Sequence, residues 1–173
     1  MKARELLYVV PLLCAAGLAE ADEAKGFFIE GRYGQSDLMN TFSEMHQDHQ
    51  PVGWLAGGYW FNKYFAVEGG YVELNDAVYD SQRTSLDTIY AGVKGRMLFE
   101  RAEGTGFFLG GRAGLHHWDQ RDHNYDQDGV SRYVGAFVGY QFTPSIALSL
   151  NYDFFHAGRS DASATTLGFE YKF

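Results

Sequence analysis

The chain has 173 residues, the length of one domain, and it contains 21 Gly, 14 Phe, 12 Tyr and 3 Pro. Its formal net charge is −8, and no run of basic residues provides the electrostatic footprint of a nucleic-acid-binding protein. After residue 21, no stretch approaches the roughly 18 to 20 consecutive apolar residues of a membrane-spanning helix, which excludes helical insertion into a bilayer.

The first 21 residues have the order of an export signal. A short basic region is followed by an apolar core over residues 6–18 and by the small-x-small cleavage site Ala-Glu-Ala over residues 19–21. A buried amphipathic helix is the alternative, and this order disfavours it. We therefore predict a signal peptide over residues 1–21 and one mature domain over residues 22–173.

Removal of this segment subtracts two basic residues, Lys2 and Arg4, and two acidic residues, Glu5 and Glu20, so the net charge stays at −8. The only cysteine, Cys14, lies in the same segment and lacks the preceding small residue of a lipoprotein cleavage site. We therefore expect no lipid anchor and a mature domain without disulfides.

The first half of the mature domain alternates apolar and polar residues with the period of two that is typical of β-strands. The predicted strands span residues 25–35, 52–61, 64–74 and 88–99. One face of these strands is apolar, and the other carries the charged residues Glu30, Arg32, Glu68, Lys94 and Arg96. The predicted connections are a polar loop over 36–50, a tight turn at Asn62-Lys63 and a polar loop over 75–87.

The second half continues this alternation in strands predicted over residues 106–118, 131–142, 146–155 and 164–173. Their polar faces carry the charged residues Arg112, Asp153, Glu170 and Lys172. Short turns are predicted at 103–104 and 143–145, and polar loops over 119–129 and 157–162. Short and longer connections therefore alternate along eight strands, as they do in transmembrane β-barrels.

Two stretches resemble a known family. The chain ends on Phe173, on a strand whose apolar face holds Leu167, Phe169 and Tyr171, and this resembles the closing strand of bacterial outer-membrane β-barrels. The hairpin GGYWFNKYFAVEGGYVEL resembles the second and third strands of the eight-stranded transmembrane domain of OmpA-like proteins. The matching motifs are Gly57-Gly58-Tyr59 and Glu68-Gly69-Gly70-Tyr71.

The resemblance implies an all-β fold, an eight-stranded antiparallel up-and-down transmembrane β-barrel like the OmpA-like and OmpX-like small barrels. It also implies a place in the cell outer membrane of a Gram-negative bacterium, with outer-membrane lipids, lipopolysaccharide and the barrel-assembly machinery as partners. Phe169, Tyr171 and Phe173 are the expected barrel-closing and assembly signal. A soluble lipocalin-like barrel is the alternative, because parity alone does not say which face lies inside. The export signal, the aromatic strand ends and Phe173 favour the membrane barrel.

In such a barrel, the charged residues of the polar faces lie in the lumen: Glu30, Arg32, Glu68, Lys94, Arg96, Arg112, Asp153, Glu170 and Lys172. Side chains can fill the interior of eight strands, so these acids and bases predict a paired, hydrogen-bonded plug. A narrow ion-conducting pore is the alternative. In the OmpA family, a lumen glutamate that exchanges between basic partners is thought to gate a pore. Glu68 and Lys94 match those positions, whereas Gly139 and Ser149 depart from the family pattern.

A lipid-modifying enzyme is a further alternative. The lipid A deacylase class has a His-x-Ser pair and a nearby acid in its late strands. This chain has His156 in that region but Gly158 in the place of the serine, and nothing in the sequence places Ser160 or Asp161 for proton transfer. We therefore expect no enzymatic activity and no cofactor.

Two sets of loop residues could bind metals. Asn124, Asp126 and Asp128 match the first half of a calcium loop, but its twelfth position is Gly135, so an acidic hairpin tip with Gly129 at the turn is favoured. The second set could form a zinc or copper site if two loops meet, and it comprises His46, Asp48, His49, His116, His117 and His123. We expect no bound metal.

The expected function is a structural and surface-interaction role. Binding residues tend to lie on loops held by a rigid scaffold, so the loops over 36–50, 75–87, 119–129 and 157–162 are the expected places for a surface ligand. No nucleic-acid partner is expected, because the chain is acidic.

Overall fold

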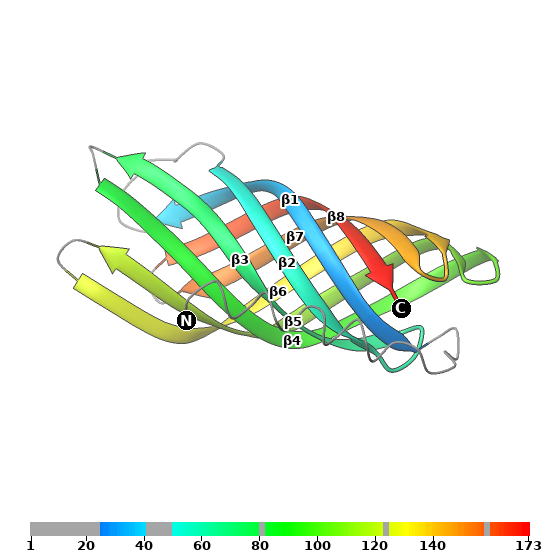
Figure 1. Cartoon of the computed structure of the whole chain (residues 1–173). Helices are drawn as coiled ribbons and strands as arrows, with labels where there is room; N and C mark the ends of the chain where they lie inside the picture. Colours follow the sequence, from blue (N-terminus) through cyan, green and yellow to red (C-terminus); the bar gives the residue numbers. More distant parts are fainter. Residues whose placement is uncertain (1–24, 41–49, 80–81, 123–124, 158–159) are drawn as a thin grey trace.

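The structure, a computed structural model, describes residues 25–40, 50–79, 82–122, 125–157 and 160–173. These residues form eight strands: β1 (Gly26–Asn40), β2 (Gln50–Trp60), β3 (Phe65–Tyr79), β4 (Gln82–Ala102), β5 (Thr105–Asp122), β6 (Tyr125–Thr143), β7 (Ile146–Ala157) and β8 (Ser160–Lys172). Each strand pairs antiparallel with its neighbours in sequence, and β1 also pairs with β8, which closes the sheet into a barrel (Figure 1). The predicted eight-stranded up-and-down barrel is therefore confirmed. The predicted signal peptide lies outside the described residues.

The two faces of the barrel wall carry different side chains. In β8, Leu167, Phe169 and Tyr171 are exposed on the outer face, whereas Thr166 and Glu170 are buried on the inner face. Exposed apolar side chains on the other strands include Tyr33, Leu55, Val67, Val93, Leu115, Val138 and Leu150. A soluble barrel would place its apolar residues inside and its charges outside, so this arrangement excludes the lipocalin-like alternative. No helix long and apolar enough to cross a membrane occurs among the described residues.

Among the connections that the structure describes, three short turns lie together at one end of the barrel, which we call the turn end (Figure 1). They join β2 to β3, β4 to β5 and β6 to β7. In the first, Asn62 Oδ1 accepts hydrogen bonds from the backbone N–H groups of Tyr64 and Phe65, at 2.8 and 2.9 Å. In the second, Gly104 has a φ of 66°, a left-handed conformation that favours glycine. The opposite end is called the loop end.

Two hairpins at the loop end are longer than the sequence predicts. β3 and β4 pair as far as Tyr79 and Gln82, and β5 and β6 pair as far as Asp122 and Tyr125. The prediction of loops over 75–87 and 119–129 was therefore wrong. The alternation of apolar and polar residues is interrupted in both segments, whereas the backbone hydrogen-bond ladder does not depend on that alternation.

The other two predicted loops, 36–50 and 157–162, are also shorter than expected. β1 continues to Asn40, and β8 begins at Ser160, where Ser160 pairs with Ala157. The loop end is thus built largely of paired strand residues, whose positions are fixed by the ladder.

Glycines on the inner face make room for the large side chains that fill the lumen. An added Cβ would meet the ring of Phe28 at Gly58 and the ring of Phe137 at Gly110. The same relation joins Gly70 to Tyr90, Gly92 and Gly114 to Tyr133, and Gly139 to Phe108. Small and large residues must alternate in this way to fill an eight-stranded barrel, so the glycines define where each aromatic ring lies.

Candidate functional site

The candidate site is the set of charged side chains inside the barrel, which we call the lumen network. Its nine members are Glu30 and Arg32 on β1, Glu68 on β3, Lys94 and Arg96 on β4, Arg112 on β5, Asp153 on β7, and Glu170 and Lys172 on β8. Their exposed fractions range from 0% to 8%, so all nine are shielded from solvent. A buried charge costs free energy unless it is paired, so each of these side chains needs a partner of opposite charge or a hydrogen bond.

Lys94 is paired with two acids. Its Nζ donates hydrogen bonds of 2.7 Å to Glu30 Oε2 and 2.7 Å to Glu170 Oε2. The ammonium also lies 5.0 Å from the ring centre of Phe28 and 5.2 Å from that of Phe137, within the range of cation–π attraction. Lys94 therefore links β4 to β1 and β8 through the middle of the lumen.

Arg32 forms a second group of contacts. Its Nη1 donates to Asp153 Oδ2 at 2.8 Å, and its Nη2 donates to the Tyr90 hydroxyl at 2.9 Å. Its guanidinium lies 3.7 Å from the ring centre of Trp54. The planar, charged group is therefore held on its edge by hydrogen bonds and on its face by an aromatic ring.

Arg112 lies between these two groups. Its Nη2 donates to Asn151 Oδ1 at 2.6 Å. The same Nη2 lies 3.8 Å from Glu30 Oε1, while Nη1 lies 3.8 Å from Glu68 Oε1 and Nε lies 3.6 Å from Asp153 Oδ1. One guanidinium is thus within ion-pair distance of acids from three strands.

Glu170 and Arg96 extend the network toward the turn end. Glu170 Oε1 accepts a hydrogen bond from Trp60 Nε1 at 3.1 Å and lies 3.8 Å from Arg96 Nη1. Arg96 also lies over the ring of Trp60, 4.1 Å from its centre, and its Nε donates to the backbone oxygen of Lys63 at 3.3 Å. Lys172 is buried at the same end, where its strand pairs with Phe28.

Aromatic side chains cover the network on both sides. Toward the loop end, the rings of Trp54, Tyr90, Tyr133 and Phe155 contact one another with centre separations of 5.0 to 5.7 Å. Toward the turn end lie two buried clusters, one of Phe28, Trp60 and Ala66 and the other of Phe108, Phe137 and Ala147. Most of the charges therefore lie between two groups of aromatic side chains, whereas Arg96 and Lys172 lie beside the turn-end clusters.

Sequence reasoning missed the neutral members of this site. Tyr90, Tyr133, Trp54 and Trp60 all contact network charges. Each occupies an inner-face position of its strand, so the parity that selected the charges would also have selected them. Glu68 and Lys94, which match an exchanging pair in the OmpA family, have other partners here. Glu68 accepts from the Tyr133 hydroxyl at 3.1 Å, and Lys94 binds Glu30 and Glu170.

A separate polar pair lies on the outer face at the loop end. His156 Nδ1 and Asp161 Oδ1 are 2.6 Å apart, in side chains that are 48% and 38% exposed. The structure therefore brings Asp161 into contact with His156, which the sequence analysis did not predict. The reason is the register of β7 and β8, which sets His156 opposite Asp161. Gly158 lies outside the described residues.

The suggested metal ligands do not gather in the described part of the chain. His116 is buried on the inner face and His117 is exposed on the outer face, so the wall separates them. His46, Asp48, His49, His123 and Asn124 lie outside the described residues. Gly129, predicted at a turn, pairs with Trp118 within the ladder, so the calcium-loop segment is extended strand there. No group of three or more His, Cys, Asp or Glu side chains in the described ranges could hold a metal ion.

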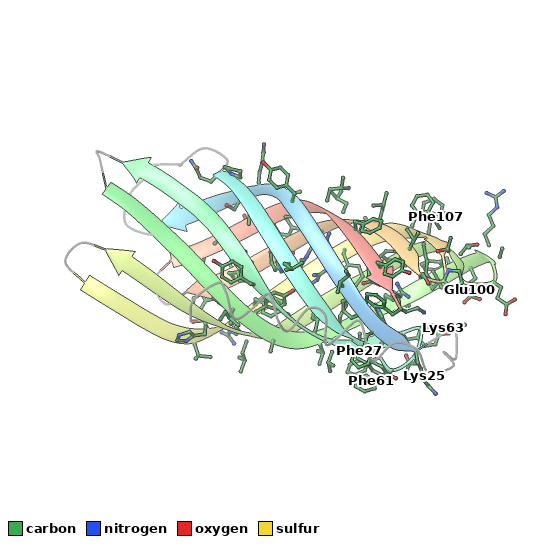
Figure 2. The ribbon with its side chains drawn as sticks, viewed as in Figure 1. Lys25, Phe27, Phe61, Lys63, Glu100 and Phe107 are labelled. Carbon is green, nitrogen blue, oxygen red and sulfur yellow. The ribbon has the colours of Figure 1, made fainter. Side chains whose placement is uncertain are left out.

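Aromatic residues also surround the outside of the turn end. Figure 2 shows Phe27, Phe61 and Phe107 there, together with the charged residues Lys63 and Glu100. Lys63 Nζ lies 3.3 Å from Glu100 Oε1, and this hydrogen bond raises the pKa of Lys63. Aromatic rings beside exposed charges are typical of the level where a barrel meets lipid headgroups.

The predicted closing residues lie at this rim. Phe169 and Tyr171 face outward on β8, and the ring of Tyr171 lies 5.0 Å from that of Phe173 in an edge-to-face contact. The backbone N–H of Phe173 donates to the carbonyl of Phe27 at 2.8 Å. The last residue is thus attached to β1, across the seam that closes the barrel.

Known proteins with the same architecture were found by comparison of the sequence and the structure. The model of the family described as "Outer membrane protein beta-barrel domain" matches residues 6–173. No curated protein matches the chain. Three solved structures have the same fold at low identity.

The attachment invasion locus protein Ail of Yersinia pestis, in complex with the heparin analogue sucrose octasulfate, is 15% identical with a TM-score of 0.60 over 87% of this chain and 99% of Ail. Neisserial surface protein A is 20% identical, with a TM-score of 0.63 over 86% of this chain and 97% of that protein. The N-terminal β-barrel domain of Pseudomonas aeruginosa OprF is 16% identical, with a TM-score of 0.59 over 84% of this chain and 97% of that domain. The predicted resemblance to small outer-membrane barrels is confirmed.

Proposed function

Since this chain belongs to the outer membrane β-barrel protein family, we propose that it is a structural protein of the Gram-negative outer membrane with a closed lumen. The turn end would face the periplasm and the loop end the cell exterior, as in other barrels with short turns at one end. Residues 1–21 would direct export, and lipids and lipopolysaccharide would surround the exposed apolar wall. The loop end would carry any interaction with a surface ligand.

A closed lumen is supported by the order in which aromatic side chains and the lumen network follow one another along the barrel axis. Ions would have to pass between the packed rings of Trp54, Tyr90 and Tyr133, then separate the buried pairs of the lumen network. Separating Lys94 from Glu30 and Glu170 would leave charges unpaired in a medium of low dielectric constant, which costs several kcal/mol. A plug of this kind supports the wall and does not conduct.

Planar-bilayer recording tests the closed lumen. The refolded wild-type barrel is expected to give no discrete conductance steps. Replacing Trp54 and Tyr133 together by Ala should still give no steps, because the buried pairs of the lumen network and the turn-end clusters remain. Steps in the wild type that change on Glu68→Ala would instead establish the narrow pore and overturn this proposal.

The same refolded protein tests for lipid-modifying activity. Incubation with lipid A is expected to leave the lipid mass spectrum unchanged. His156→Ala is the control, because His156 contacts Asp161 on the outer face and is the candidate general base. A mass change that disappears in this variant would show that the protein is an enzyme. No such change is expected, because this chain has Gly158 where the lipid A deacylase class has its serine.

The proposed surface role rests on the loop end, whose paired strands form a rigid support. Ail, which has the same fold, was crystallised in complex with a heparin analogue. A sulfated polysaccharide is therefore the first ligand to test. A variant with the β3–β4 and β5–β6 hairpins shortened should still fold and resist detergent in cells. It should lose surface attachment; unchanged attachment would contradict the role of these hairpins.

A further inference from the structure

His116 is a buried histidine near the loop end of the lumen. It lies on the inner face of β5 and is 2% exposed. Its Nε2 lies 3.1 Å from the backbone oxygen of His156 on β7, although β6 separates these two strands in the wall. The described pairing of β6 with β7 ends at Tyr133 and Phe155, one residue before His156. The side chain of His116 therefore holds β7 just beyond the end of this ladder.

This hydrogen bond determines where the imidazole carries its hydrogen. A carbonyl oxygen only accepts hydrogen bonds, so Nε2 of His116 must be the donor, and in the neutral ring Nδ1 then carries no hydrogen. Nδ1 is buried and has no hydrogen-bond partner within the described part of the chain. A second proton would place a positive charge and a new N–H donor there without an acceptor, which costs free energy in a buried place.

The described groups around the ring of His116 offer no carboxylate to balance that charge. On the inner faces of β4 to β7, the titratable or charged groups at this level and next toward the turn end are bound to other side chains of the lumen: Tyr90, Arg112, Tyr133 and Asp153. The imidazoles of His117 and His156 are exposed on the outer face. The buried position therefore favours the neutral form of His116.

Phe155 connects His116 to the aromatic rings at the loop end. Its ring meets the imidazole edge-to-face at 5.2 Å, stacks on Tyr133 at 5.7 Å and lies 5.3 Å from the ring of Trp54. Phe155 also pairs in register with Ala162 on β8, which is buried on the inner face. If His116 leaves its place, the end of β7 loses its hydrogen bond to β5, and water reaches Phe155 and Ala162.

We propose that His116 is a pH-sensitive latch, which keeps the loop end of the lumen closed at neutral pH and releases it in acid. A histidine that reaches water is protonated below its ordinary pKa of about 6.5, so the closed state is fully favoured above this pH and becomes less favoured as the pH falls below it. One proton taken up on opening changes the ratio of open to closed molecules by a factor of about ten for each pH unit. The lumen network lies beyond the aromatic rings, so the closed lumen of the proposed function does not depend on the latch.

Thiol labelling of the refolded mature chain measures this opening. The only cysteine, Cys14, lies in the predicted signal peptide, so Ala162→Cys supplies a single thiol at a buried position. Ala102→Cys, at an exposed turn-end position, corrects for the pH dependence of the thiol reaction itself. The ratio of the two rates with a water-soluble methanethiosulfonate should be constant between about pH 8 and about pH 6.5. Below that pH it should rise by up to about ten-fold for each pH unit.

Histidine variants in the same background identify the group that titrates. His116→Gln keeps an N–H donor for the carbonyl of His156 but takes up no proton, so the rate ratio should no longer depend on pH. His117→Gln is the matched control, because His117 is the adjacent histidine and is exposed on the outer face, and it should leave the rise unchanged. His156→Gln should also leave it unchanged, although its imidazole contacts Asp161.

Three results would overturn the latch: a rate ratio that does not change with pH when all histidines are present, an unchanged rise in His116→Gln, or a rise that only His156→Gln removes. If His116→Gln fails to give the folded, heat-modifiable band, His116→Phe takes its place, since it keeps an aromatic ring beside Phe155 and does not titrate. A ratio independent of pH in that variant supports the latch, and a rise below about pH 6.5 refutes it.

Discussion

Tyr133 on β6 donates its phenolic hydrogen to Glu68 on β3, so a 3.1 Å hydrogen bond joins strands that are not neighbours in the wall. The same phenol belongs to the aromatic layer, where its ring stacks on Phe155 with a centre separation of 5.7 Å. Tyr133 therefore connects the apolar layer to the lumen network.

Tyr133→Phe should reduce the free energy of unfolding by about 1 to 3 kcal/mol, because it leaves a buried carboxylate oxygen of Glu68 without its donor. The ring remains, so the apolar layer keeps its packing. Tyr152→Phe is the control, since Tyr152 is exposed on the outer face and should change little. Urea unfolding in lipid vesicles, followed by tryptophan fluorescence, measures both. Equal stabilities of the two variants would contradict this account.

Lys94→Met should have a larger effect, a loss of about 3 to 5 kcal/mol, since Glu30 and Glu170 would lose a partner that each binds at 2.7 Å. The stem of methionine fills a similar volume, so the change is mainly electrostatic. Lys63→Met provides the comparison, because Lys63 and Glu100 form an exposed pair at the turn end. The same unfolding experiment should register no clear change there. A small effect of Lys94→Met would mean that the buried acids find other partners.

Gly110→Ala tests whether inner-face glycines determine the packing of the lumen. The new Cβ would meet the ring of Phe137 and the carbonyl of Gly95, so overpacking should cost about 1 to 3 kcal/mol. Gly31→Ala is its counterpart on the outer face, where an added Cβ has no atom within 4 Å. That variant should be as stable as the wild type or slightly more so, given the higher strand propensity of alanine. Unfolding midpoints that fall equally in both variants would reject the packing argument.

The inner and outer faces could be read from the sequence because a strand has a period of two. Glu30 and Ile29 are adjacent in sequence and necessarily face opposite sides of the wall. The ends of β5 and β6 could not be found in this way, since Gln120 and Gln127 pair through their backbones in a segment where the sequence has no regular apolar alternation. Hydropathy carries no period-two signal in such a segment.

The spacing of the charged residues along the sequence also could not predict which of them pair. Lys94 and Glu170 meet across the lumen, and their distance in space depends on the tilt and shear of the closed barrel rather than on sequence separation. The contact between His156 and Asp161 was easier to predict from the sequence. A two-residue connection at 158–159 would set Ala157 opposite Ser160 and therefore His156 opposite Asp161, so an assumed tight hairpin would have predicted the contact.

Phe173→Ala should separate assembly from stability. The backbone bond from Phe173 to Phe27 survives the substitution, and the lost ring contacts only Tyr171 among the described aromatic residues. Stability of the refolded barrel should therefore fall by only about 0.5 to 1.5 kcal/mol, the contribution of one aromatic pair. In cells, the folded, heat-modifiable fraction should fall several-fold, because we propose that Phe173, which directly follows β8, is recognised during assembly. Phe142→Ala is the matched control, since the ring of Phe142 makes the same edge-to-face contact with Tyr140 at 5.0 Å and does not lie on the closing strand. Pulse-chase labelling with gel analysis gives the assembly rate of each variant. Equal rates for Phe173→Ala and Phe142→Ala would mean that both rings act only at the membrane interface, and that assembly recognises another feature of β8.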